Sequence, residues 1–112
     1  MQIRNGPVFQ AGQFLSDAFS LAQLDPYFLI TPDAWTAPAN LRFMFSPDGL
    51  TYNVVHYDGV PLEVLCPAPN AAVKLRPEMR TWPNGTYLKF LSAYNDSKII
   101  QPVLRTFKLV AA

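Results

Sequence analysis

The side chains best suited to acid–base or nucleophilic chemistry in this 112-residue chain are its only histidine, His56, and its only cysteine, Cys66. Asp58 follows His56 by two residues, so the two side chains would share one face of a strand. A histidine that acts as a general base needs a nucleophile to activate, and no serine or cysteine in a recognisable nucleophile context accompanies this pair. We therefore expect His56 to be a strand-surface residue near a turn, and we predict that the chain is not an enzyme.

The sequence also predicts no metal and no cofactor. Zinc needs about four ligands, chiefly cysteine and histidine, whereas Cys66 has no second cysteine or histidine nearby and is expected to be a small buried residue. Calcium needs about six to eight oxygen atoms. Some could come from acidic side chains in predicted loops, namely Asp33, Asp48, Asp58, Glu63 and Glu78. Turn geometry alone explains the Asp-Gly pairs, so we expect no calcium.

Both tryptophans lie in proline-flanked segments that are predicted to be loops, Trp35 in residues 31–38 and Trp82 in residues 76–85. Exposed aromatic side chains in loops commonly serve recognition. One hypothesis is therefore a platform on which a glycan stacks, to which three tyrosines could add, namely Tyr27, Tyr57 and Tyr94. The alternative is that one tryptophan closes an end of the fold and the other anchors a subunit contact.

Positive charge near Trp82 comes from three side chains, Arg80, Arg76 and Lys74, and the carboxylate of Glu78 offsets part of it. Salt links from Arg80 to an acidic protein surface are the natural use of such a group. The net charge of +1 provides no strong field that would attract nucleic acid or an anionic membrane. We expect neither partner.

The bulk composition indicates a single domain with an unusually apolar surface. Charged residues make up 15% of the chain, against about 25% in an ordinary soluble domain. The mean hydropathy is +0.08, which predicts that copies of the chain or a neighbouring protein cover part of the surface. The alternative is a merely apolar monomer. A single cysteine excludes an internal disulfide, and the first residues lack the apolar run of a signal peptide, so we expect synthesis in a cytosol.

Eleven prolines divide the chain into pieces of about five to ten residues, a length that suits strands rather than helices. Strands are predicted over residues 16–21, 27–30, 41–45, 51–57, 60–65, 72–75, 86–92 and 103–110. This spacing is typical of an all-β, antiparallel β-sandwich or jelly roll of about eight short strands, here over residues 14–112. Residues 1–13 carry little folding signal and are predicted to form an extended arm that attaches to a partner, with Phe9 and the adjacent Phe14 as contacts.

The strongest turn signals lie in residues 43–59, FMFSPDGLTYNVVHYDG, where two Asp-Gly pairs stand ten residues apart. The first pair predicts a hairpin between residues 41–45 and 51–57. Four side chains of this hairpin are expected between the two sheets, namely Phe43, Phe45, Tyr52 and Val54. The second pair, Asp58-Gly59, predicts another reversal and hence a three-stranded meander.

Residues 46–52, SPDGLTY, resemble the central hairpin of discoidin-like and galactose-binding-like β-sandwiches. Over residues 14–110 the chain more closely resembles small β-sandwich proteins of tailed-phage and prophage structural modules. The shared features are an apolar strand, a segment matched at Pro32, Trp35, Thr36 and Ala37, the Ser-x-Asp-Gly hairpin, a strand at residues 87–92 and a final strand at residues 105–110. The loop at residues 76–85 and the high proline count depart from the simpler members.

The resemblance implies a non-enzymatic virion protein, made in the host cytoplasm. It suggests a capsid decoration, or cement, protein that binds the exterior of the major capsid protein and stabilises adjacent capsomers. A closed homo-oligomer, such as a trimer on a local three-fold axis, would use the apolar surface. The alternatives are a neck-, tail- or fibre-associated virion protein and a carbohydrate-binding module for host adhesion.

Overall fold

The computed structural model describes residues 1–21, 24–65 and 67–111. The elements are β1 (Gln2–Phe9), β2 (Pro26–Ile30), β3 (Asn40–Ser46), β4 (Asn53–Val54), β5 (His56–Tyr57), β6 (Val60–Pro61), β7 (Glu63–Val64), β8 (Ala72–Lys74), the 3-10 helix η1 (Pro77–Met79), β9 (Tyr87–Tyr94), β10 (Ser97–Lys98) and β11 (Arg105–Ala111). The predicted all-β fold is confirmed. The prediction for Cys66 lies outside the described residues.

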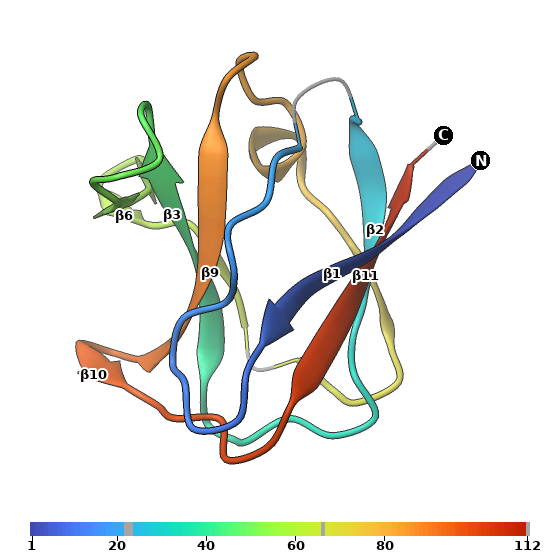
Figure 1. Cartoon of the computed structure of the whole chain (residues 1–112), viewed down its shortest axis with the longest axis vertical. Coiled ribbons are helices and arrows are strands. Elements are labelled where there is room, and N and C mark those ends of the chain that lie inside the picture. Colours follow the sequence, from blue (N-terminus) through green and yellow to red (C-terminus); the bar gives the residue numbers. More distant parts are fainter. Residues whose placement is uncertain (22–23, 66, 112) are drawn as a thin grey trace.

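The strands form two packed antiparallel sheets, with β3 and β9 in one layer and β1, β11 and β2 in the other (Figure 1). The first sheet has the order β1-β11-β2-β8. The second has the order β10-β9-β3-β4, and β7 also pairs with β3. Among the described strands, four connections cross from one sheet to the other, those between β2 and β3, β7 and β8, β8 and β9, and β10 and β11, as expected for a β-sandwich.

The predicted strand at residues 16–21 is an irregular edge segment rather than a regular strand. It runs along β9 through the isolated bridges Leu15–Leu91 and Phe19–Leu88. The backbone N–H of Ser16 also donates to the carbonyl oxygen of Phe90 at 2.9 Å. The segment thus fills the edge position that a jelly roll needs beside β9.

The core is a column of four fully buried phenylalanines that joins the two sheets. Phe43 of β3 meets Phe90 of β9 with ring centroids 5.1 Å apart, and Phe90 meets Phe107 of β11 at 5.7 Å. Phe9 of β1 continues the column at 6.0 Å from Phe107. The edge-to-face angles place ring hydrogens against ring faces, a favourable geometry for aromatic pairs. The period-2 alternation predicted for residues 103–110 is confirmed from Arg105 onward, whereas Val103 and Leu104 lie outside the strand and are both exposed.

The prediction that residues 1–13 form an extended arm is wrong for residues 2–9. β1 pairs with β11 in a register that runs from Gln2↔Ala111 to Phe9↔Arg105. Phe9, predicted to contact a partner, is fully buried in the core. Gly6 and Pro7 look like strand breakers, yet the sheet accommodates them by a register shift between Asn5 and Val8. The partner strand β11 lies about a hundred residues away in the sequence, so no local pattern could predict this pairing.

The first predicted turn is confirmed, and its carboxylate organises it. Gly49 has a φ of +78°, a conformation that glycine adopts without strain. The carboxylate of Asp48 accepts hydrogen bonds from the backbone N–H groups of Leu50 at 2.8 Å and Thr51 at 3.1 Å, and from the hydroxyl of Ser46 at 2.9 Å. These bonds, led by the one from Leu50, hold the pKa of Asp48 below its ordinary value of 3.8.

The predicted return strand at residues 51–57 is interrupted, and the three-stranded meander is wrong. β4 pairs with one end of β3 and β7 pairs with the other end of the same edge. Between them β5 and β6 form a separate two-stranded hairpin. Val54 lies opposite Met44 on the outer face of the sheet, and Tyr52 carries the ammonium group of Lys89 over its ring at 4.6 Å. Neither side chain therefore fills the space between the sheets.

Candidate interaction surfaces

Trp35 closes one end of the sandwich instead of presenting a free ring. Its indole packs edge-on against Phe9 at 5.3 Å and Phe107 at 5.4 Å. The indole N–H donates to the carbonyl oxygen of Ala39 at 2.9 Å. The first tryptophan thus fits the predicted role of a plug and offers little surface to a ligand.

The loop that carries Trp35 is held by a polar network around the buried side chain of Arg105. Arg105 donates from Nε to Gln101 Oε1 and from Nη2 to Thr36 Oγ1, both at 3.1 Å. Gln101 accepts a further bond from the backbone N–H of Thr36 at 3.1 Å and donates to Ser92 Oγ at 3.0 Å. Two of the segments that carry the family resemblance, at residues 35–36 and 105–106, therefore meet to brace the fold.

Trp82 covers the opposite flank of the core. Its ring stacks on Phe43 at 5.7 Å and 23°, and its N–H donates to the carbonyl oxygen of Met79 at 3.0 Å. Arg80 places its guanidinium 3.8 Å from the ring centre of Tyr27 and forms an ion pair with Asp25 at 3.2 Å. These side chains are engaged inside the chain, so neither is poised as a free contact.

Phe14, the last of the predicted partner contacts, is half-buried in the segment along β9. Lys98 of β10 holds its ammonium group 4.8 Å from the centre of the Phe14 ring. The ring is thus already covered in part by the chain itself.

Part of the exposed apolar surface lies on the outward side of the β1-β11-β2-β8 sheet, which we call the apolar sheet face. One row across the sheet runs Ile3, Val110, Phe28 and Lys74, as the register pairs show. Ile3 is 63% exposed and Phe28 is 37% exposed. The face comprises Ile3, Asn5, Val8, Phe28, Ile30, Ala72, Lys74, Thr106, Lys108 and Val110. On a sheet that has one face toward solvent, the side chains of such an outward row are normally polar. An apolar row therefore indicates a surface that contacts another molecule.

The charge on the apolar sheet face is entirely positive. Lys74 and Lys108 lie in adjacent rows, and none of the ten residues that define the face is acidic. At one end of the face a hollow of about 400 Å³ is lined by Ile30, Leu104 and Lys108 among others, and its lining also includes one acidic residue, Asp33. Leu104 is 55% exposed there. The face therefore combines exposed aliphatic groups, a recess and two ammonium groups.

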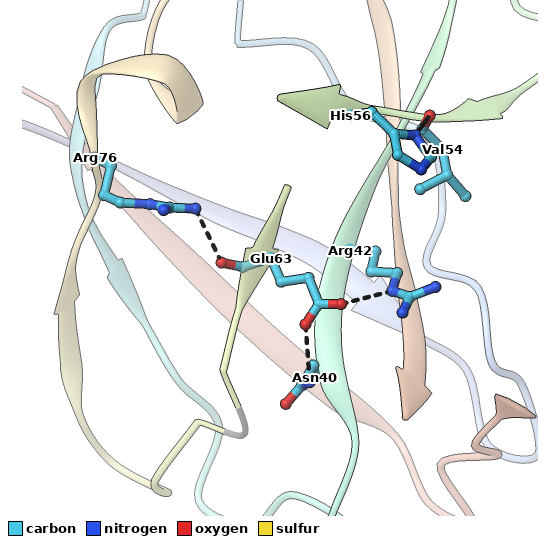
Figure 2. A network of polar contacts seen from close by, with 6 residues as sticks. All are labelled: Asn40, Arg42, Val54, His56, Glu63 and Arg76. Carbon is cyan, nitrogen blue, oxygen red and sulfur yellow. Dashed lines mark hydrogen bonds and ion pairs between the residues drawn. The ribbon is translucent and has the colours of Figure 1, made fainter. Parts of the chain in front are cut away.

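A second concave feature, the hairpin groove, lies between the β5–β6 hairpin and the start of η1. It has a volume of about 530 Å³, and its lining includes Tyr57, Asp58, Val60, Pro61, Leu62, Glu63, Leu65, Arg76 and Glu78. Glu63 lies at the centre of its polar network (Figure 2). The carboxylate of Glu63 accepts bonds from Arg42 Nε at 2.8 Å and from Asn40 Nδ2 at 2.9 Å.

Arg76 and His56 flank this network. Arg76 donates to the backbone oxygen of Glu63 at 3.3 Å and pairs with the carboxylate of Glu78 at 3.2 Å (Figure 2). The ring Nδ1 of His56 lies 3.1 Å from the carbonyl oxygen of Val54, at the foot of the hairpin. A carbonyl can only accept, so Nδ1 carries the proton in this contact.

Within residues 1–21, 24–65 and 67–111, no group of three or more histidine, cysteine, aspartate or glutamate side chains is placed to hold a metal ion. No helix of this described part is long and apolar enough to cross a membrane.

Comparison with known proteins adds no relative. No protein-family model, no curated protein and no solved structure matches this chain. The candidate surfaces must therefore be judged by their own geometry and charge.

Proposed function

We propose that the chain is a non-enzymatic structural protein of a tailed-phage virion, most simply a capsid decoration protein that docks on the shell and joins adjacent capsomers. The sequence resemblance suggests this role, and one observation carries it further. The outward face of one sheet carries a row of three apolar side chains, Ile3, Val110 and Phe28, of which Ile3 and Phe28 are exposed, whereas a solvated sheet face is normally polar.

The charge of this face favours a partner of different sequence over a second copy of the same face. In a two-fold contact the face of one copy meets the same face of the other. Lys74 and Lys108 of the two copies would then be brought together without carboxylates on the face to neutralise them. A shell protein that presents apolar groups edged by carboxylates would complement both features. A three-fold contact joins two different patches of the chain, so a homotrimer would not bring this face against itself.

The first experiment is the copy number of the chain in purified particles, measured by quantitative mass spectrometry against the major shell protein. Hundreds of copies would support decoration of the whole shell. A few copies to a few tens would support the alternative of a neck, tail or fibre position. Absence from particles would overturn the virion role.

The docking surface is tested by rebinding the purified chain to particles that lack it. Phe28→Glu places a carboxylate at the centre of the apolar sheet face, and we expect occupancy to fall at least about tenfold, or about 1.4 kcal/mol. Tyr87→Glu is the matched control, since Tyr87 is similarly exposed but lies on β9 of the other sheet. Equal rebinding of the two variants would show that another surface makes the contact.

A further inference from the structure

The β5–β6 hairpin is an insertion that the jelly roll does not need. The N–H of Leu62 donates to the carbonyl oxygen of Val55 at 2.8 Å, which closes the base of the hairpin beside β3. Beyond this base the chain projects from the sheet edge, as β6 does in Figure 1. Tyr57 and Val60 form its last cross-strand pair and are 52% and 60% exposed. A projecting hairpin with an exposed apolar pair at its tip adds little to the stability of the fold and is better suited to binding a ligand.

The turn of the hairpin has a defined backbone geometry, which sets the position of the Tyr57 backbone. Asp58 and Gly59 both adopt positive φ, at +52° and +79°, as the two central residues of a type I′ turn do. This turn matches the right-handed twist of the strands and fixes their register. A ligand that stacks on Tyr57 would therefore lose little free energy in ordering the loop.

The polar groups beside Tyr57 are also held in position before any ligand binds. Glu63 is fixed by Arg42 and Asn40, and Arg76 is fixed by Glu78 and the backbone of Glu63 (Figure 2). A guanidinium has five N–H donors, and these contacts engage only its Nε and one terminal nitrogen. The groove thus offers an aromatic face, carboxylate acceptors and guanidinium donors in a rigid frame.

The charges of the lining select the class of ligand. Three acidic residues line the groove, Asp58, Glu63 and Glu78, but Glu63 is paired with Arg42 and Glu78 with Arg76. The remaining negative charge of Asp58 disfavours anionic ligands, and the Arg76 guanidinium in the lining disfavours a simple cation. A neutral ligand with many hydroxyl groups and one apolar face satisfies all the groups at once. Its hydroxyls donate to carboxylates and accept from Arg76, while its C–H face packs on the Tyr57 ring. The volume of about 530 Å³ is in the range of about 300–1,000 Å³ that small-ligand sites occupy.

We propose that the hairpin groove binds a neutral saccharide, with Tyr57 as the stacking platform and Arg76, Glu78 and Asp58 as the hydroxyl-binding groups. This site differs from the apolar sheet face and does not depend on the virion role. It also replaces the tryptophans as the platform, because Trp35 and Trp82 are engaged with the core.

The test is saturation-transfer-difference NMR on the full chain with the methyl glycosides of glucose, mannose, galactose and N-acetylglucosamine. Each is used at about 10 mM, since we expect a dissociation constant of about 1 mM for an open groove. Methyl glucuronide serves as the anionic probe. We expect transfer to at least one neutral glycoside and a weaker signal from the glucuronide.

Two tyrosine variants locate the binding. Tyr57→Ala should abolish the transfer without changing the unfolding midpoint, because the ring is half-exposed on a projecting hairpin. Tyr94→Ala removes a ring of similar exposure on β9 and should leave the transfer intact. The proposal is overturned if no neutral glycoside receives saturation, if the glucuronide binds best, or if the two variants lose the signal equally.

Discussion

The burial of Phe9 predicts that the first strand is a structural part of the sandwich. Phe9 is fully buried and contacts the rings of Trp35 and Phe107. Replacing a buried phenylalanine by alanine costs about 3–5 kcal/mol, which is a large share of the about 5–15 kcal/mol that stabilises an ordinary domain. We therefore expect Phe9→Ala to lower the free energy of unfolding by about 4 kcal/mol.

Equilibrium unfolding in urea, followed by tryptophan fluorescence, measures this loss. With an m value of about 2 kcal/mol/M, a loss of about 4 kcal/mol lowers the midpoint by about 2 M. The matched control is Ile3→Ala on the same strand, because Ile3 is exposed on the outer face. Its effect should stay within about 0.5 kcal/mol.

Deletion of residues 1–13 extends the same test. It removes Phe9 together with the hydrogen-bonded pairing of β1 to β11, so we expect no cooperative unfolding transition. The reasoning would be refuted by a truncated chain that unfolds cooperatively with a free energy of unfolding within about 1 kcal/mol of that of the full chain. Residues 1–13 would then be an arm, as the sequence predicts. A Phe9→Ala variant as stable as Ile3→Ala would refute the reasoning equally.

Three further outcomes follow from particular contacts. Trp35→Ala should destabilise the chain by about 2–4 kcal/mol in urea unfolding, since the indole plugs the core; unchanged stability would contradict that role. Glu63→Gln removes the charge partner of Arg42 and should cost about 1–3 kcal/mol, and a double-mutant cycle with Arg42→Met should show the two effects to be non-additive. The folded-state pKa of Asp48 lies below its ordinary value of 3.8, so its stabilising effect is present above about pH 4 and is lost as the pH falls through the folded pKa. The melting temperature of Asp48→Ala should accordingly lie below that of the unaltered chain at neutral pH and approach it at about pH 2, and a constant gap would refute the assignment.

Local patterns were enough for the fold class and for several elements. The alternation in β9 and β11 predicts which side chains are buried, because successive side chains of a strand point to opposite faces. The Asp-Gly pairs predict both reversals, since each requires a positive φ that few other residues tolerate. A chain cut by eleven prolines into short pieces has little choice but an all-β fold.

The interaction surfaces could not be predicted from local sequence patterns. Period-2 alternation separates two faces of a strand but does not say whether the second face is solvated, so the exposure of Phe28 could not be read from the apolar run YFLI. For the tryptophans in the proline-rich loops the sequence left two roles open, an exposed platform or a plug at one end of the fold, and in the structure both rings pack on the phenylalanine column. A loop tryptophan is buried when the fold leaves an open end that only a large ring can fill.

The sequence by itself determined most of the short strands, the two Asp-Gly turns and the all-β fold class, because these depend on neighbours within about ten residues. Only the tertiary structure decided that β1 joins β11, that the β5–β6 hairpin stands apart, and that Tyr57 and Arg76 line one groove. Those contacts join segments far apart in the chain, and the free energy that selects them comes from burying surfaces that no local pattern specifies.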